Sequence, residues 1–181
     1  MATSTHDESS TDLPLPEQDF VDRAYERLDA LRASYRERQG RVHSTHGVGN
    51  AQGWTEREAL SAHLGEMAAR LEGVEERLVF GRLDMVDQSV RHVGRLSLSH
   101  EDGTPLLVDW RAPAARPFYQ ATSAEPDGVV RRRHISTRDR RVTGLEDELL
   151  DASNASGLEL QGEGALMHAL SEARDGRMGD I

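Results

Sequence analysis

The sequence predicts an α+β fold: an N-terminal antiparallel helical hairpin (a coiled coil), followed by a small, mainly antiparallel β-rich unit and a C-terminal helix. Two heptad-spaced sets of apolar residues are separated by a glycine-rich segment, which predicts the hairpin. After Leu78 the apolar spacing becomes strand-like, and turn-forming residues divide the chain into short pieces. With 36% hydrophobic and only 4% aromatic residues, the chain allows a modest core, which suits this arrangement.

Residues 1–19 are expected to form a disordered acidic lead-in. They carry five acidic residues, two prolines and neither lysine nor arginine. A stretch with few apolar residues and one sign of charge does not bury enough surface to offset the entropy of ordering.

Residues 20–79 are expected to form the projecting hairpin. Gly40 is expected to end the first helix, and Thr55 with Glu58 forms a capping box that predicts the start of the second. Each arm would extend roughly 30 Å at about 1.5 Å per residue. The alternative is two ordinary helices of a globular bundle, but the narrow apolar stripe and charged outer faces favour a projecting hairpin. The stripe consists of Val21, Ala24, Leu28, Leu31 and Tyr35, then Leu60, Leu64, Met67, Leu71, Val74 and Leu78.

Residues 80–151 are expected to form the β-rich unit, with about five short strands. Strand patterns occur in LVFGRLDM, HVGRLSLS, LLVDW, FYQAT and VVRRRHIST, and turns are predicted at Asp102-Gly103 and at Pro126-Asp127-Gly128. A helical turn is expected at Glu146 to Leu150. Residues 152–181 are expected to form a linker and a helix, from about Glu163 to Arg174, that leads into an ATPase domain missing from this chain.

Composition excludes several kinds of chemistry. The chain has no cysteine, which rules out disulfides, thiolate zinc sites and thiol catalysis. All 22 basic residues are arginine, so a phosphate-binding loop with lysine and Schiff-base chemistry are excluded as well. The net charge of −10 argues against general adhesion to nucleic acid or to an anionic membrane. The start does not resemble a signal peptide and no apolar run is long enough to span a bilayer, so we expect a cytoplasmic protein without a membrane partner.

The most specific motif is LLVDWRAPAARPFY, residues 106–119. Pro113 and Pro117 fix the backbone there, so neither a helix nor a central strand continues through them. Together with GRLSLSHEDG before it and VVRRRHIST and GLEDELLD after it, residues 94–151 resemble the N-terminal part of the HelD family. These are superfamily 1 helicase-like ATPases that bind bacterial RNA polymerase. The closing GEGALMHALSEARDGRMGDI, residues 162–181, resembles the segment before their nucleotide-binding motifs.

The resemblance implies a module of a larger ATPase. This chain would contain no catalytic, cofactor-binding or metal-binding residues, and ATP and Mg²⁺ would belong to the parent protein. The implied partner is bacterial RNA polymerase, whose secondary channel the coiled coil would enter. The parent protein would use ATP to release nucleic acid from stalled polymerase and recycle the enzyme.

The tip of the expected hairpin, residues 40–54, is the first candidate site. It contains no Asp or Glu, so it is expected to plug or wedge the channel, because completing a Mg²⁺ site requires carboxylate oxygens. Two histidines in a glycine-rich segment without an acidic or thiol partner are a weak metal motif. The candidate polymerase contacts are Arg41, His43, His46, Asn50 and Trp54.

An arginine run is the second candidate site, and two interpretations stay open. The arginines could bind phosphates through bidentate contacts. On a strand, however, Arg131 and Arg133 would face one side and Arg132 the other, and the acidic segment 145–151 offers internal ion pairs. The candidates for nucleic-acid contact are Arg131, Arg132, Arg133, Arg138, Arg140 and Arg141.

Residues Asp109, Trp110 and Arg111 are expected to be structural, as are Pro113 and Pro117. On a strand Asp109 and Arg111 share a face while Trp110 points the other way. This predicts a buried Asp–Arg pair that orients the proline turn and a tryptophan in the core.

Two alternative functions remain open at this point. The chain could be a DNA-binding accessory segment of a true DNA helicase that unwinds DNA with ATP, or a stand-alone scaffold. Salt-dependent binding to naked DNA would favour the helicase, and binding to polymerase without DNA would favour the polymerase module.

Overall fold

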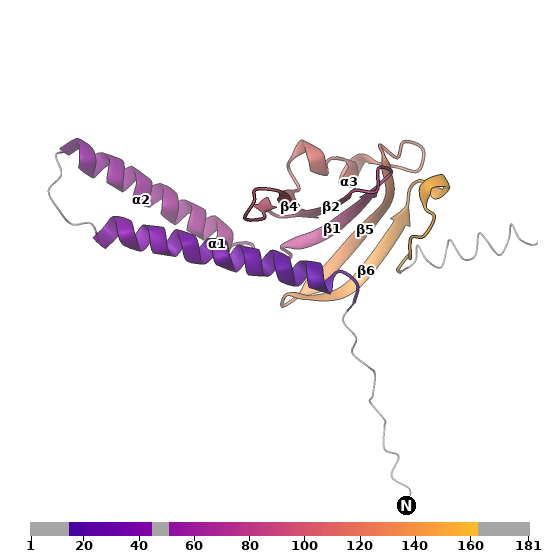
Figure 1. Ribbon diagram of the computed structural model, residues 1–181, viewed down its shortest axis with the longest axis horizontal. Coiled ribbons are helices and arrows are strands. Elements are labelled where there is room, and N and C mark those ends of the chain that lie inside the picture. The colour runs from indigo at the N-terminus through magenta and orange to yellow at the C-terminus, as the bar shows by residue number, and fades with distance from the viewer. Residues whose placement is uncertain (1–14, 45–50, 163–181) are drawn as a thin grey trace, which may run out of the picture.

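The computed structural model describes residues 15–44 and 51–162, and these form an α+β fold with a helical hairpin followed by a mixed six-stranded sheet (Figure 1). The predicted fold class is therefore confirmed. Helix α1 (Gln18–Ser44) and helix α2 (Ala51–Glu72) lie side by side. In Figure 1 they leave the sheet together and extend well beyond it to the left.

The two helices are longer than expected. Helix α1 continues through Gly40 to Ser44, and α2 begins at Ala51, so the helix end at Gly40 and the capping-box start at Thr55 are both wrong. A glycine inside a helix costs only about 0.5–1 kcal/mol, which is too little to end a helix that packs against a partner. At about 1.5 Å per residue, α1 is roughly 40 Å long and α2 roughly 33 Å.

The heptad seam of the hairpin holds only in the half near the sheet. Leu28 is fully buried and Leu71 is 8% exposed, whereas Leu60, near the outer end of α2, is 49% exposed. Val74 and Leu78 lie beyond the end of α2, and Leu78 is buried in the core shared by the hairpin and the sheet. The apolar spacing therefore continues past the helix because the chain enters this common core.

The sheet has the strand order β3-β4-β2-β1-β5-β6. Strands β2 and β4 run parallel, and the other neighbouring strands are antiparallel, in agreement with the mainly antiparallel prediction. The strands are β1 (Val79–Met85), β2 (Val90–Gly94), β3 (Leu98–Ser99), β4 (Pro105–Asp109), β5 (Val129–Arg138) and β6 (Arg141–Leu149).

The two predicted turns form. Gly103 has φ +85° between β3 and β4, and Gly128 has φ +75° before β5. Glycine adopts a positive φ without steric strain because it has no Cβ atom. The predicted helical turn at Glu146 to Leu150 is wrong, because residues up to Leu149 belong to β6 and pair with β5. The predicted C-terminal helix lies outside the described residues.

The FYQAT segment is not a strand. Two short helices follow β4 instead: the 3₁₀ helix η1 (Pro113–Ala115) and helix α3 (Pro117–Gln120), each beginning at a proline. Proline suits the first position of a helix because its fixed φ is helical and the missing N–H has no helical acceptor there.

Both faces of the sheet are covered. Helix α1 packs on one face, where its apolar residues share a core with Val79, Ile135 and Leu145. On the other face, α3 places Phe118 directly against Gly81, where a Cβ atom would lie 2.3 Å from the phenyl ring. The prolines therefore end β4 and position the side chain that closes this second core.

The first prediction concerns the inner half of the hairpin. Leu28→Ala should lower the free energy of unfolding by about 2–5 kcal/mol, because it leaves a cavity at a fully buried site. Leu60→Ala, the same change at a half-exposed site, should alter it by no more than about 0.5 kcal/mol. Urea unfolding followed by circular dichroism measures both, and equal losses would contradict this packing.

Candidate functional site

Three carboxylates and three arginines form a closed ring of ion pairs on the face of the sheet that carries α1. We call this arrangement the ionic ring. Acidic and basic groups alternate around it, so their formal charges cancel. The side chain of Arg82 is 23% exposed and those of the other five are at most 9% exposed. In order around the ring, the members are Glu17, Arg82, Asp84, Arg131, Asp147 and Arg133.

Glu17 resolves a conflict between like charges. Arg82 on β1 and Arg133 on β5 are direct cross-strand neighbours, an arrangement that is unfavourable by itself. Glu17 comes from the segment just before α1 and accepts hydrogen bonds from both guanidinium groups, at 2.6 and 2.9 Å. Its backbone has φ +81°, which residues other than glycine seldom adopt, and these contacts hold it there. The prediction that the acidic lead-in is disordered is therefore wrong for residues 15–19. Residues 1–14 lie outside the described part.

His92 completes the surroundings of Glu17. Its Nε2 lies 2.9 Å from the second carboxylate oxygen of Glu17. Burial lowers the pKa of His92 although Glu17 opposes this, so the neutral imidazole donates its N–H to the carboxylate. Burial alone would raise the pKa of Glu17, but the hydrogen bond from His92 and the charge of Arg82 outweigh it and hold that pKa at about 2.

The other half of the ring attaches the segment that follows β6. Asp147 accepts hydrogen bonds from Arg133 at 2.6 and 2.8 Å and from the backbone N–H of Gln161 at 2.6 Å. Arg131 donates to the carbonyl oxygen of Glu159 at 2.6 Å. The ring thus ties the segment before α1, the centre of the sheet and residues 159–161 into one unit.

A second set of ion pairs, the hairpin-base cluster, joins the β5–β6 turn to the helices. Arg140 in this turn donates to Asp29 on α1 and to Glu75 after α2, each at 2.6 Å, and its guanidinium lies 4.6 Å from the centre of the Tyr25 ring. The hydrogen bonds from Arg140 lower the pKa of both carboxyl groups, with a further contribution from Arg32.

Arg32 connects the two helices within this cluster. It is 8% exposed and donates at 2.7 and 3.2 Å to the carbonyl oxygen of Leu71, in the last turn of α2. Such terminal carbonyls have no helical N–H to bind. Arg32 also pairs with Glu75 at 2.6 Å, so the base of the hairpin is fixed on both helices.

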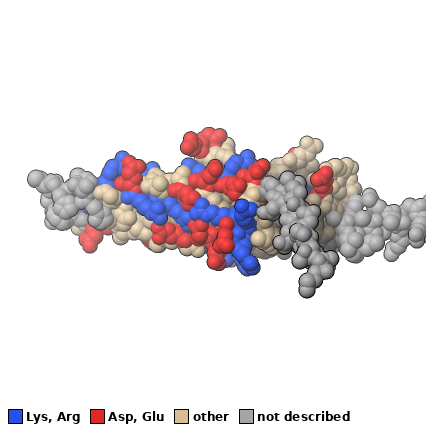
Figure 2. Space-filling model, turned by 90° about the horizontal axis from the view of Figure 1, so that it is seen from below, with Lys and Arg blue, Asp and Glu red and all other residues tan. Residues whose placement is uncertain are grey.

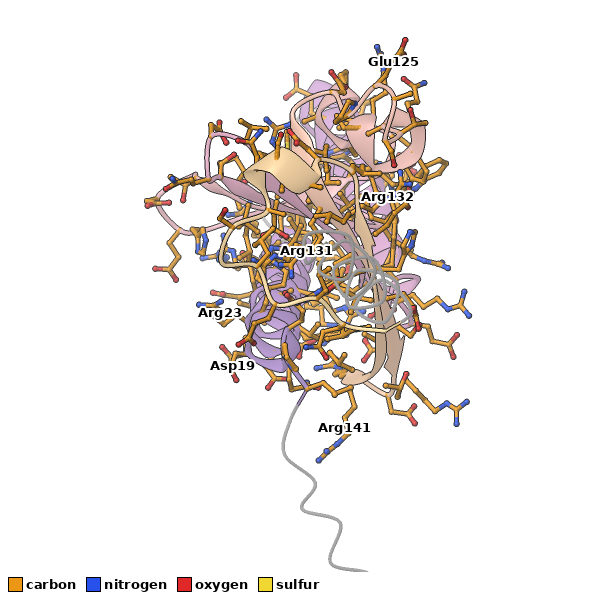
Figure 3. All side chains as sticks on the ribbon, turned by 90° about the vertical axis from the view of Figure 1, so that its right-hand side faces the viewer. Asp19, Arg23, Glu125, Arg131, Arg132 and Arg141 are labelled. Atoms are coloured by element: carbon orange, nitrogen blue, oxygen red, sulfur yellow. The ribbon has the colours of Figure 1, made fainter. Side chains whose placement is uncertain are left out.

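The arginine run is largely used inside the fold. Arg131 and Arg133 belong to the ionic ring, and Arg132 points to the other face of the sheet, where it pairs with Glu148 (Figure 3). Arg132 also donates to the carbonyl oxygens of Phe118 and Ala121 at the end of α3. Arg140 belongs to the hairpin-base cluster, and the remaining members, Arg138 and Arg141, are exposed.

The Asp109–Arg111 pair forms, but it lies at the surface. Arg111 donates to both carboxylate oxygens of Asp109, at 3.0 and 2.7 Å, and its side chain is 55% exposed. The prediction of Trp110 in the core is wrong, since it is 47% exposed. Phe118 occupies the core on this face, and Trp110 packs edge-on against the exposed Tyr119.

A groove beside the base of the hairpin was missed at the level of sequence. Its volume is about 800 Å³, and none of the described residues that line it carries a carboxylate. We call it the arginine–aromatic groove, and its characteristic residues are Arg77, Arg95, Trp110, Arg111, Tyr119 and His134. Its members come from the α2–β1 connection, the segments after β2 and β4, helix α3 and strand β5, so no local sequence pattern unites them.

The predicted tip contacts are only partly within the described residues. Arg41 lies on α1, exposed and 3.6 Å from Glu37, one turn earlier. His43 and Trp54 belong to the end of α1 and the start of α2, and His46 and Asn50 lie outside the described part. Within residues 15–44 and 51–162, no three His, Asp or Glu side chains are grouped to hold a metal ion. No helix in that part is long and apolar enough to cross a bilayer.

The second prediction concerns Glu17. The folded-state pKa of about 2 lies below the ordinary 4.5, so the carboxylate stabilises the fold fully above about pH 4.5 and loses this contribution as the pH falls toward 2. Glu17→Gln should lower the free energy of unfolding by roughly 3 kcal/mol at pH 7, because it removes the carboxylate between Arg82 and Arg133. Each arginine then keeps one carboxylate partner, Asp84 or Asp147. The difference from wild type should shrink as the pH falls from 4.5 to 3.

Glu26→Gln serves as the matched control, since Glu26 is an exposed carboxylate on α1, the helix that follows Glu17. Urea unfolding at several pH values measures both variants. A Glu17→Gln variant as stable as the control at pH 7, or a difference independent of pH, would contradict the role assigned to Glu17.

Comparison with known protein families agrees with this architecture. No curated protein matches the chain significantly. The family described as "DNA helicase IV HelD, N-terminal domain" matches residues 15–162, which is most of the chain. The match begins just before Glu17 and ends just after Gln161, so it includes every segment that the ionic ring ties together. The chain therefore belongs to the family of N-terminal domains of DNA helicase IV HelD.

Proposed function

We propose that this chain is the RNA polymerase-binding module of a HelD-like ATPase and that its hairpin inserts into the secondary channel of the bacterial enzyme. The observation that carries the proposal is a hairpin with a fixed base and a free outer half (Figure 1). The parent protein would act in the cytoplasm, using ATP and Mg²⁺ outside this chain to release nucleic acid and recycle polymerase.

The dimensions of the hairpin suit insertion into a pore. Each helix with its side chains is about 10–12 Å across, so two paired helices make a rod roughly 20 Å wide. The hairpin-base cluster and the shared core hold this rod at a defined angle to the sheet. A rod held in this way can reach into a channel while the sheet stays outside.

The charges of the hairpin support a blocking role. On the face of the molecule seen in Figure 2, arginines and carboxylates are interspersed along the hairpin, with neither sign dominating. The segment from Gly40 to Trp54 has no carboxylate, and Arg41 adds a positive charge there. This tip suits occupation of the channel and does not suit delivery of oxygen ligands to a catalytic Mg²⁺.

The alternative, a DNA-binding accessory segment of a helicase, was based on the arginine run. Arg131, Arg132, Arg133 and Arg140 all pair with carboxylates of the chain itself. Guanidinium groups already satisfied in this way are poorly available to phosphates, which disfavours strand β5 as a DNA contact.

The third prediction tests insertion by changing the length of the hairpin. Deleting residues 36–42 and 62–68 removes one heptad from each helix, with Arg41 among the deleted residues. The deletion preserves the phase of the seam and brings residues 43–52 about 10 Å closer to the sheet. The affinity of the full chain for core RNA polymerase, measured by biolayer interferometry, should fall at least roughly tenfold, a loss of about 1.4 kcal/mol.

A second variant replaces residues 43–52 with a Gly-Ser linker of equal length and tests the tip chemistry separately. Arg116→Gln, an exposed change far along the chain from the hairpin, is the surface control. Circular dichroism must show that each variant folds. Unchanged affinity for the shortened hairpin would place the polymerase contact on the sheet and contradict insertion.

The fourth prediction concerns transcript cleavage. The intact chain should not stimulate cleavage by a backtracked polymerase, because residues 40–54 lack carboxylates. It should compete with cleavage-stimulating factors that use the same channel. Gel analysis of labelled transcripts measures both effects, and cleavage stimulated by the chain alone would show that acids outside the tip, such as Glu37 or Glu56, reach the metal.

A further inference from the structure

The arginine–aromatic groove carries a local charge opposite to that of the whole chain. The chain has a net charge of −10, yet the groove is lined by Arg77, Arg95 and Arg111 and by no carboxylate among the described residues. Arg77 and Arg95 are exposed and form no ion pair or side-chain hydrogen bond with the described part of the protein. No carboxylate in the lining of the groove offsets the charges of Arg77 and Arg95, so this surface favours anions.

Arg111 is oriented within this surface. Its Nε and Nη2 atoms donate to Asp109, which fixes the plane of the guanidinium group. The Nη1 atom makes no hydrogen bond within the described residues and is able to donate to a ligand. Asp109 offsets the charge of Arg111, so Arg111 contributes one oriented donor, and the net positive charge of the groove comes from Arg77 and Arg95.

The groove also presents two large aromatic rings to solvent. Trp110 is 47% exposed and Tyr119 is 52% exposed, and their centroids are 6.3 Å apart in an edge-on arrangement. This contact leaves a substantial part of each residue accessible to solvent.

We propose that the arginine–aromatic groove binds single-stranded nucleic acid. Phosphates would contact Arg77, Arg95 and Arg111, and a base would stack on Trp110. Channels for single strands combine these two features: arginines that follow the backbone and aromatic rings on which unpaired bases stack. Duplex DNA does not fit this chemistry, because its bases are stacked on each other and unavailable to the rings.

This inference goes beyond the polymerase-binding function and does not depend on it. The groove lies beside the base of the hairpin, lined by residues of the α2–β1 connection such as Val74 and Arg77. The proposed channel insertion concerns the outer end of the hairpin. The groove variants described below should therefore retain polymerase binding, which separates failure of one proposal from failure of the other.

The experiment uses the full chain and fluorescein-labelled 12-nucleotide oligothymidylate and oligouridylate, with binding followed by anisotropy at low salt. Arg77→Gln/Arg95→Gln should weaken binding at least roughly tenfold and should reduce the slope of log K against log[salt] by about 1.4, the value for two lost phosphate contacts on a single strand. The matched control, Arg116→Gln/Arg138→Gln, changes the net charge equally at exposed sites outside the groove and should have less than roughly twofold effect.

The stacking contact is tested at Trp110. Trp110→Leu should weaken binding roughly tenfold, whereas Trp110→Phe keeps a ring and should retain most of the affinity. In a Trp54→Phe background Trp110 is the remaining tryptophan of the two in the chain, so its fluorescence should be quenched when the oligonucleotide binds.

Three outcomes would overturn the proposal. The first is no binding of either oligonucleotide at 100-fold lower salt than physiological, roughly 1–2 mM, where electrostatic attraction is strongest. The second is equal weakening by the groove and control arginine pairs, which would indicate diffuse attraction. The third is binding of an acidic, aromatic-containing peptide that depends on these residues while the oligonucleotides do not bind, which would make the groove a peptide site.

Discussion

The buried charges of the ionic ring are the constraint on which the rest of the structure depends. An arginine or carboxylate removed from water is strongly unfavourable unless it is paired and hydrogen-bonded. Here each carboxylate serves two arginines, so displacing one member leaves two others without a full set of partners. The segment before α1, the central strands and residues 159–161 must therefore assemble together.

The ring also determines the direction of the hairpin. Helix α1 begins directly after Glu17, so its first turn is fixed to the centre of the sheet. The hairpin-base cluster fixes it again at Asp29, about 18 Å along the axis at about 1.5 Å per residue. Two attachment points define an axis, and the rest of α1 with its partner follows that axis away from the sheet (Figure 1). The projection of the hairpin thus follows from the ion pairs at its base together with the core that α1 shares with the sheet.

The two groups of arginines serve different purposes because of their surroundings. Arg131 and Arg133 lie under α1, where only paired charges are tolerated, and they bind carboxylates of the same chain. Arg77 and Arg95 lie at the rim of an open groove, where water solvates them at little cost, and they remain available to an external anion. The position of an arginine in the fold, more than its place in a basic run, therefore indicates whether it contacts a ligand.

The sequence by itself determined the elements that depend on local chemistry. Heptad spacing gave the hairpin, Asp102-Gly103 gave a turn, and strand alternation placed Arg131 and Arg132 on opposite faces. Tertiary structure decided what depends on contacts between distant segments. The parallel pairing of β2 with β4, the strand at residues 146–149 and the capture of Glu17 all follow from strand register and from a shared core. Local periodicity records which way a side chain points, but it does not record which distant charge lies opposite, and that pairing decided the site.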